Sequence, residues 1–133
     1  MGILSWLFGS VATAGHIDGP GFFDVEVVGE SNYQRAIAKA RGRAAPGETA
    51  LTQTTLVLEN NNPYDKQAVR VDIGGQTVGY LVRANARAYR NELKRNGHPN
   101  ITATCAAKIV GGKPRPDGTD GLYGVILDLP TVD

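Results

Sequence analysis

The stretch ENNNPYDKQAVRVDIGGQTVGYL, residues 59–81, decides the fold because it contains two strands and the connections around them. The segment 68–73 alternates apolar and polar residues, the pair 74–75 is Gly-Gly, and 76–81 predicts a returning strand. A Gly-Gly pair between two such runs is typical of a β-hairpin. The loop 60–67 before them holds three asparagines, a proline, a tyrosine, an aspartate and a lysine. These polar residues predict either a turn or a polar pocket.

The rest of the chain adds more strands and two helices. In the hairpin, Val69, Val71 and Ile73 should share one face. Ser31 or Asn32 can cap a short helix that ends at Gly42. Strands without a regular strand–helix alternation favour a mainly β (α+β) fold with two helices, built as a small barrel or curled antiparallel sheet of about six strands. The further strands are expected at 22–29, 49–59, 101–111 and 122–130, and the second helix at 82–97 with Ala84, Ala88, Tyr89 and Leu93 on its apolar side.

Length, charge and cysteine content limit the function. With 133 residues, the chain is expected to form one domain at 22–130, followed by a tail at 131–133. A net charge of +1 excludes a protein that grips long nucleic acids by charge alone. The single cysteine, Cys105, lies within a predicted strand, which indicates a buried, unreactive thiol and a reducing, cytoplasmic location.

Residues 1–21 form an apolar N-terminal segment followed by a Gly/Pro-rich linker. The apolar cluster in this segment is too short to span a membrane. It also lacks the basic start of a secretory signal. We therefore expect residues 1–14 to dock on the domain or on a protein partner. No transmembrane segment is expected.

No pattern in the sequence supports catalysis, a metal site or a cofactor. A phosphate-binding loop is missing, and His16 and His98 have no partner at metal-ligand spacing. Asp65 and Asp72 could form a carboxylate pair, but they are seven residues apart on either side of a loop and a strand. We expect a protein that is not an enzyme.

Binding is better supported, because amides, an aromatic ring and a basic helix face come close together in sequence. Asn60, Asn61 and Asn62 can each donate and accept hydrogen bonds, which suits a base edge or a sugar hydroxyl. Tyr64 offers a ring for stacking. Arg83 and its helix-mates Arg87, Arg90 and Lys94 share one face and could meet phosphate. The alternative is that the asparagines only shape the turn, Asp65 only caps the returning chain, and the arginines form a solvated face.

The motif in 59–81 resembles that of the HIRAN domain. In this family, Asn-Pro-Tyr-Asp is followed by an Ala-Val strand, a glycine turn and Val-Gly-Tyr-Leu before a helix, as in this chain. VEVVGESNYQRAI and GLYGVILDLP extend the resemblance over roughly residues 23–130. The resemblance implies an OB-like β-barrel. It also implies binding of a single-stranded DNA 3′ end, as in eukaryotic members joined to Snf2-type helicases that remodel stalled replication forks.

The resemblance also implies which residues form the pocket. Tyr80 stands at the aromatic position of the Val-Gly-x-Leu motif, and Arg83 at the basic position that follows. In the family members that bind a DNA end, a stacking aromatic residue and an arginine follow the first strand. This chain does not have both of them at the same places. Asn32 and Tyr33 are the candidates there. The loop members carried over from the family are Asn61, Asn62, Tyr64 and Asp65.

The leading hypothesis is thus a nucleic-acid-binding domain for single-stranded DNA, with a role in repair, replication or recombination. Tyr33, Tyr64 and Tyr80 would stack on bases, and Arg83 and Arg87 would meet phosphate. Asn61, Asn62 and Asp65 would bond a base edge or a terminal hydroxyl. The alternative hypothesis is a protein-interaction module of a larger assembly, acting through residues 1–14.

Overall fold

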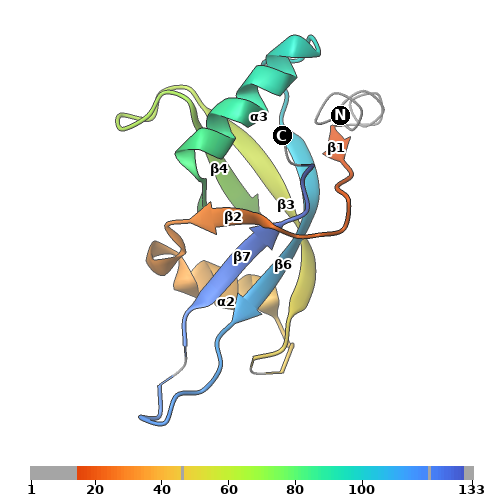
Figure 1. The fold of residues 1–133 in the computed structure, drawn as a ribbon. Helices are drawn as coiled ribbons and strands as arrows, with labels where there is room; N and C mark the ends of the chain where they lie inside the picture. The colour runs from red at the N-terminus through yellow and green to blue at the C-terminus, as the bar shows by residue number, and fades with distance from the viewer. Residues whose placement is uncertain (1–14, 46, 120, 131–133) are drawn as a thin grey trace.

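Six antiparallel strands close into a small barrel in the computed structural model, which describes residues 15–45, 47–119 and 121–130 (Figure 1). Neighbouring strands follow the order β6-β3-β4-β5-β2-β7, and β7 pairs back with β6 to close the ring. This confirms the predicted mainly β fold with two helices. The strands are β2 (Val25–Val28), β3 (Ala50–Glu59), β4 (Ala68–Ile73), β5 (Gln76–Leu81), β6 (Ala103–Gly111) and β7 (Tyr123–Leu127).

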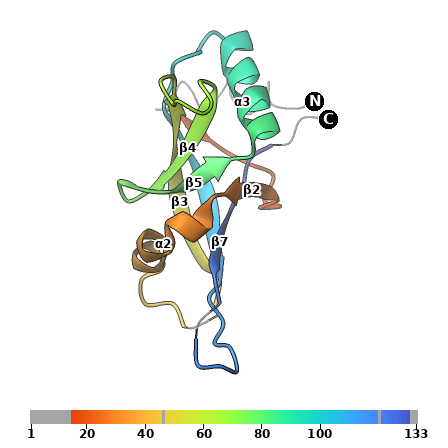
Figure 2. The same ribbon diagram turned by 90° about the vertical axis from the view of Figure 1, so that its left-hand side faces the viewer.

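The two helices lie at opposite ends of the barrel, as two perpendicular views show (Figures 1 and 2). Helix α2 (Gln34–Arg41) buries Ile37, and helix α3 (Arg83–Arg95) follows β5 directly. Because α3 begins next to the β3–β4 loop, its first turns can reach the polar residues of that loop.

Two details of the predicted helices are wrong. Neither Ser31 nor Asn32 caps α2, because both belong to the short 3-10 helix η1 (Glu30–Asn32) that precedes it. On α3 the buried apolar residues are Ala86, Tyr89 and Leu93, whereas Ala84 is exposed and Ala88 is half-buried. Positions 86, 89 and 93 form the stripe of a helix that packs against the barrel.

The barrel core follows the predicted alternation. Val69 and Val71 are fully buried and Ile73 nearly so, as their shared face requires. Cys105 is also fully buried, with its Sγ atom 3.3 Å from Oγ1 of Thr54. Burial raises the pKa of the Cys105 thiol to about 12, so the prediction of a buried, unreactive thiol is consistent with its surroundings.

The Gly/Pro-rich segment contains a strand that the sequence did not predict. β1 (His16–Ile17) pairs in parallel with β6, and Ile17 is fully buried in the core. Beyond it, a Cβ atom on Gly19 would lie 2.3 Å from the backbone oxygen of Asp128, so the chain passes close to that residue. The expected boundaries at 22 and 130 stay predictions, and residues 1–14 and 131–133 lie outside the described residues.

Candidate nucleic-acid interface

The β3–β4 loop is held in shape by the side chain of Asn62. Its Oδ1 atom accepts hydrogen bonds from the backbone nitrogens of Tyr64 at 2.8 Å and Asp65 at 3.2 Å. Its Nδ2 atom donates to Oε1 of Glu59 at 2.9 Å. These bonds match the turn interpretation, in which an asparagine side chain replaces backbone partners. The Asn62 amide is therefore engaged within the protein.

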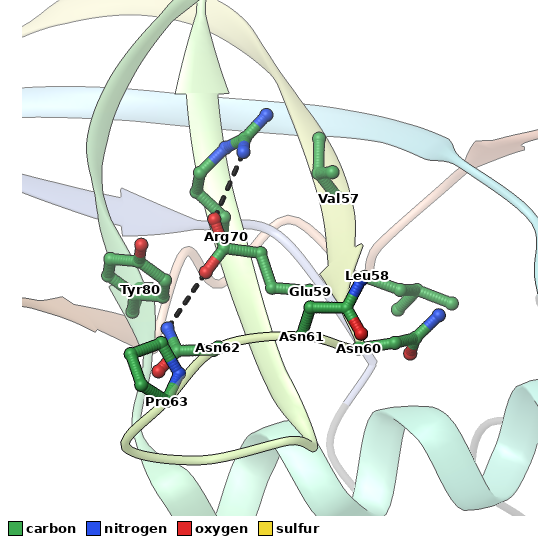
Figure 3. Close-up of a pocket in the computed structure, with 9 residues that line it drawn as sticks. All are labelled: Val57, Leu58, Glu59, Asn60, Asn61, Asn62, Pro63, Arg70 and Tyr80. Atoms are coloured by element: carbon green, nitrogen blue, oxygen red, sulfur yellow. Dashed lines mark hydrogen bonds and ion pairs between the residues drawn. The ribbon is translucent and has the colours of Figure 1, made fainter.

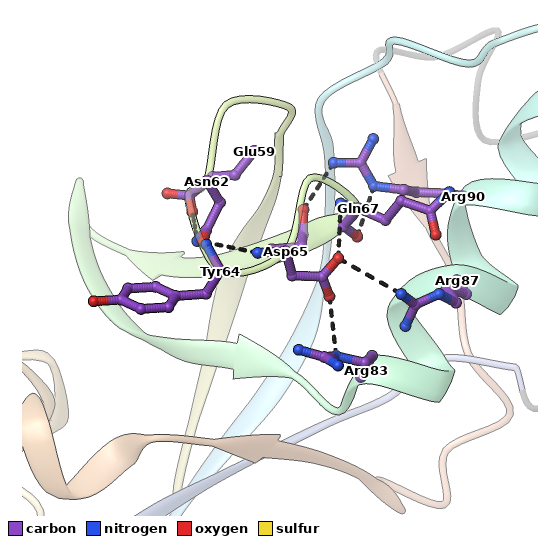
Figure 4. A network of polar contacts seen from close by, with 9 residues as sticks. Glu59, Asn62, Tyr64, Asp65, Gln67, Arg83, Arg87 and Arg90 are labelled. Carbon is purple, nitrogen blue, oxygen red and sulfur yellow. Dashed lines mark hydrogen bonds and ion pairs between the residues drawn. The ribbon is translucent and has the colours of Figure 1, made fainter.

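Asp65 joins the loop to α3 (Figure 4). Its Oδ1 atom accepts a hydrogen bond from the backbone nitrogen of Gln67 at 2.9 Å. The Nε atom of Arg83 lies 3.4 Å from Oδ2, and Nη2 of Arg87 lies 3.7 Å from Oδ1. The Asp65 side chain is 15% exposed, against 64% for Arg83 and 45% for Arg87. The carboxylate is thus sheltered, while both arginines keep much of their surface open to a ligand.

Arg90 braces the same loop. It donates at 2.8 Å from Nε to the backbone oxygen of Gln67, from Nη2 to that of Ala68, and from Nη1 to Oδ1 of Asn60. Burial lowers the pKa of Arg90, and the nearby Asp65 partly opposes this. The arginine face of α3 therefore packs on the loop. The sequence predicted the shared face but did not reveal this bracing role.

Tyr64 is the most exposed large apolar side chain among the described residues, at 89%. Figure 4 shows its ring directed away from the polar network around Asp65. Within the part of the chain that the structure describes, only its backbone nitrogen makes a hydrogen bond, to Oδ1 of Asn62. The loop therefore presents an aromatic face to solvent, as a stacking site requires.

A pocket of about 530 Å³ opens between this loop and the end of β2, and we call it the loop pocket. Seven of the nine predicted site residues line it, whereas Asn61 and Arg87 do not. The chain enters it after Gly29, whose φ of 81° lets the backbone turn from β2 into η1. The lining residues are Val28, Asn32, Tyr33, Asn62, Pro63, Tyr64, Asp65, Ala68, Tyr80, Leu81 and Arg83.

Tyr80 reaches this pocket because Gly79 lets two strands come very close. A Cβ atom on Gly79 would lie 2.4 Å from Cγ1 of Val27 and 2.6 Å from the backbone oxygen of Val28, and its φ is 155°. Tyr80 then sits opposite Val28 across the β2–β5 pairing. Burial and a hydrogen bond with Glu59 raise the pKa of Tyr80 to about 12, so its hydroxyl stays protonated at neutral pH.

A second pocket of about 540 Å³ lies on the other side of Asn62, and we call it the strand pocket (Figure 3). Arg70 lines this pocket and makes three side-chain hydrogen bonds. Its Nε and Nη2 atoms donate to the two Asp72 oxygens at 2.9 and 3.0 Å, and Nη1 donates to Oε2 of Glu59 at 3.0 Å. The lining residues are Val57, Leu58, Glu59, Asn60, Asn61, Asn62, Pro63, Arg70 and Tyr80.

The sequence pointed to the asparagines and to Tyr80 of the strand pocket, but it did not single out Arg70 or Glu59, although a signal for Arg70 was present. Arg70 and Asp72 alternate with the fully buried Val69 and Val71, which predicts that both face outward. Arg70 is half-buried and lines the pocket, whereas Asp72 is only 8% exposed and does not line it. Burial acts to raise the pKa of Glu59, but hydrogen bonds with Asn62, Arg70 and Tyr80 outweigh it and lower that pKa. Asp72 thus pairs with Arg70, and Asp65 with the arginines of α3, so the two carboxylates belong to separate networks.

Neither a metal-ligand group nor a membrane-spanning helix occurs within the described residues. Within residues 15–45, 47–119 and 121–130, no three His, Cys, Asp or Glu side chains form a group that could hold a metal ion. The expectation of no metal, cofactor or catalytic residue stays a prediction. In the same part of the chain, no helix has the length and apolar character needed to cross a membrane.

Comparison with known proteins gave one family match and two similar structures. The family model of the HIRAN domain matches residues 20–110. A protein from Lactobacillus plantarum is 20% identical with a TM-score of 0.40, covering 78% of this chain and 90% of its own. The HIRAN domain of human HLTF is 22% identical with a TM-score of 0.35, covering 77% of this chain and 70% of its own. A search of curated proteins found no match.

Proposed function

The chain belongs to the HIRAN domain family, which is known as a nucleic-acid-binding domain, and we propose that its loop pocket holds the end of a single strand of DNA. One observation carries this proposal: seven residues singled out for nucleic-acid contact line one pocket, and they come from η1 and the residue after it, the β3–β4 loop, β5 and the start of α3. The protein would bind without catalysis. We place it in the cytoplasm, in DNA repair, replication or recombination.

The aromatic residues of the loop pocket suit unpaired bases. Tyr64 offers an exposed ring on the loop, while Tyr33 and Tyr80 line the same pocket. Stacking of a base on an aromatic side chain contributes about 1–3 kcal/mol. Bases within a duplex are already stacked on their neighbours, so this arrangement favours a single strand.

The charged residues suit the sugar–phosphate part of a terminal nucleotide. Among the described residues, Arg83 and Arg87 form ion pairs only with Asp65, at 3.4 and 3.7 Å, so their other nitrogens can meet phosphate oxygens. An ionised carboxylate offers about four lone-pair sites. Oδ2 of Asp65, which meets only Arg83 among the described residues, can accept a bond from a terminal hydroxyl.

Fluorescence anisotropy with a short labelled single strand tests the proposal. We expect binding at low salt, and a loss of about fivefold to a hundredfold in Tyr64→Ala, which removes a stacking ring. Phe22→Ala is the matched control, because Phe22 is also an exposed aromatic residue, at 74%, but lies outside both pockets. Absence of binding at low salt would contradict the proposal.

Two additional measurements test the details. Arg83→Gln and Arg87→Gln should each reduce the slope of log affinity against log salt by about 0.7, because each removes one phosphate contact. A circular strand of the same sequence should compete poorly with the linear one, since it has no end. Equal competition by the circle would refute end binding while leaving single-strand binding in place.

A further inference from the structure

The strand pocket and the loop pocket are joined by one row of outward-facing residues. The strand register places Val57 opposite Arg70, Arg70 opposite Tyr80, and Tyr80 opposite Val28. This row crosses β3, β4, β5 and β2 and enters one pocket at each end. Asn62, Pro63 and Tyr80 line both pockets. A ligand that fills the loop pocket can therefore continue over Tyr80 into the strand pocket.

The charge balance of the strand pocket shows which part of a nucleotide it would take. The ion-pair network beside the loop pocket sets Arg83 and Arg87 against the one carboxylate of Asp65, so +2 and −1 leave +1, although Arg87 itself does not line the pocket. The network beside the strand pocket sets Arg70 against Glu59 and Asp72, so +1 and −2 leave −1, although Asp72 does not line the pocket. A phosphate is attracted to the first pocket and repelled from the second. Of the parts of a nucleotide, the neutral base therefore suits the strand pocket better than the phosphate does.

The Arg70 side chain is arranged to present a flat surface. Three of its nitrogens donate in the plane of the guanidinium, two to Asp72 and one to Glu59. These partners fix the plane and balance its charge, while 31% of the side chain stays exposed. Bases stack on guanidinium planes as they do on aromatic rings. Arg70 therefore resembles a stacking platform more than a phosphate ligand.

Asn61 supplies a group that can recognise a base edge at the same pocket. Its side chain is exposed, and within the described residues it makes no hydrogen bond, in contrast to its neighbour Asn62. A carboxamide both donates and accepts, which matches the edges of nucleobases.

We propose that the strand pocket is a second nucleobase subsite, which stacks a base on Arg70 and contacts its edge through Asn61. This inference rests on the proposed function, because the base belongs to the nucleotide next to the one in the loop pocket. The volume of about 540 Å³ lies within the range of small-ligand sites.

The test is an anisotropy titration with short strands in which one base at a time is removed, leaving an abasic sugar. In the wild-type protein, loss of the adjacent base should weaken binding about fivefold or more. Asn61→Ala and Arg70→Lys should weaken binding of the intact strand, and removal of that base should then cost little more. Arg70→Lys keeps the charge that Glu59 and Asp72 require but lacks the flat surface.

Asn91→Ala is the matched control, because Asn91 is also an exposed asparagine and lies on α3 outside both pockets. It should respond to the abasic strand as the wild type does. If removal of the adjacent base costs the same in all four proteins, the second subsite is refuted while end binding stands. A wild-type protein that binds no strand overturns both proposals.

Discussion

The loop pocket and the strand pocket share a wall and have nearly equal volumes, about 530 and 540 Å³, but the ion-pair networks beside them have opposite net charges. Asn62, Pro63 and Tyr80 belong to both. The difference comes from the element behind each pocket. α3 brings two arginines to one carboxylate, whereas β4 brings Arg70 beside Asp72 and within reach of Glu59. Neighbouring sites on one loop can thus be specialised by the elements that support them.

The two networks also differ in how firmly they are fixed. The contacts of Arg83 and Arg87 with Asp65 are 3.4 and 3.7 Å long and largely exposed to solvent. Arg70 contacts its carboxylates at 2.9–3.0 Å and is less exposed. Exposed ion pairs contribute little to stability and exchange partners easily. We therefore expect the loop pocket to rearrange around a phosphate and the strand pocket to keep its shape.

Substitution of Gly79 should cause the largest loss in the free energy of unfolding. It should also displace Tyr80, the residue that joins the two pockets. Gly79→Ala places a Cβ atom 2.4 Å from Val27 in a backbone conformation that side chains rarely adopt. We expect a loss of about 3 kcal/mol in the free energy of unfolding, measured by urea denaturation. In the control Gly124→Ala, the nearest contacts are 3.5 Å. An equal loss in both variants would contradict this account.

Substitution of Asn62, one of the three residues that line both pockets, should have an intermediate effect on the free energy of unfolding. Asn62→Ala deletes two hydrogen bonds to the loop backbone and one to Glu59. We expect it to lower the free energy of unfolding by about 1–2 kcal/mol in the same urea experiment. Asn61→Ala is the matched neighbour and should change it by less than about 0.5 kcal/mol, as exposed substitutions usually do. Similar losses would show that Asn62 does not hold the loop.

Protonation of Glu59 should have the smallest effect on the free energy of unfolding. It should remove one negative charge from the strand pocket and none from the loop pocket. Its folded-state pKa lies below the ordinary value of 4.5, so ionised Glu59 stabilises the fold above that pH. This contribution should disappear as pH falls through the lowered folded-state pKa. Urea midpoints measured between about pH 3 and pH 7 should show a shallower pH dependence in Glu59→Gln. If the wild type and Glu59→Gln show the same dependence of the urea midpoint on pH, the pKa of Glu59 is not lowered in the folded state.

Much of the fold could be predicted from local pattern. The alternation in 68–73, the Gly-Gly pair and the returning strand specified the β4–β5 hairpin, and the structure has that hairpin at Ala68–Ile73 and Gln76–Leu81. β1 could not be predicted, because a two-residue strand leaves no periodic signal. Its partner β6 follows about ninety residues later in the chain.

For the candidate site, the sequence by itself determined which chemical groups are present and that most of them face one region. Seven of the nine residues named from the motif and the helix face do line one pocket. Only the tertiary structure decided what each group does. Asn61 and Asn62 are identical in chemistry, yet Asn62 is engaged in the turn and Asn61 is exposed at the strand pocket. Hydrogen bonding depends on which atoms the strand register and the helix bring within about 3 Å.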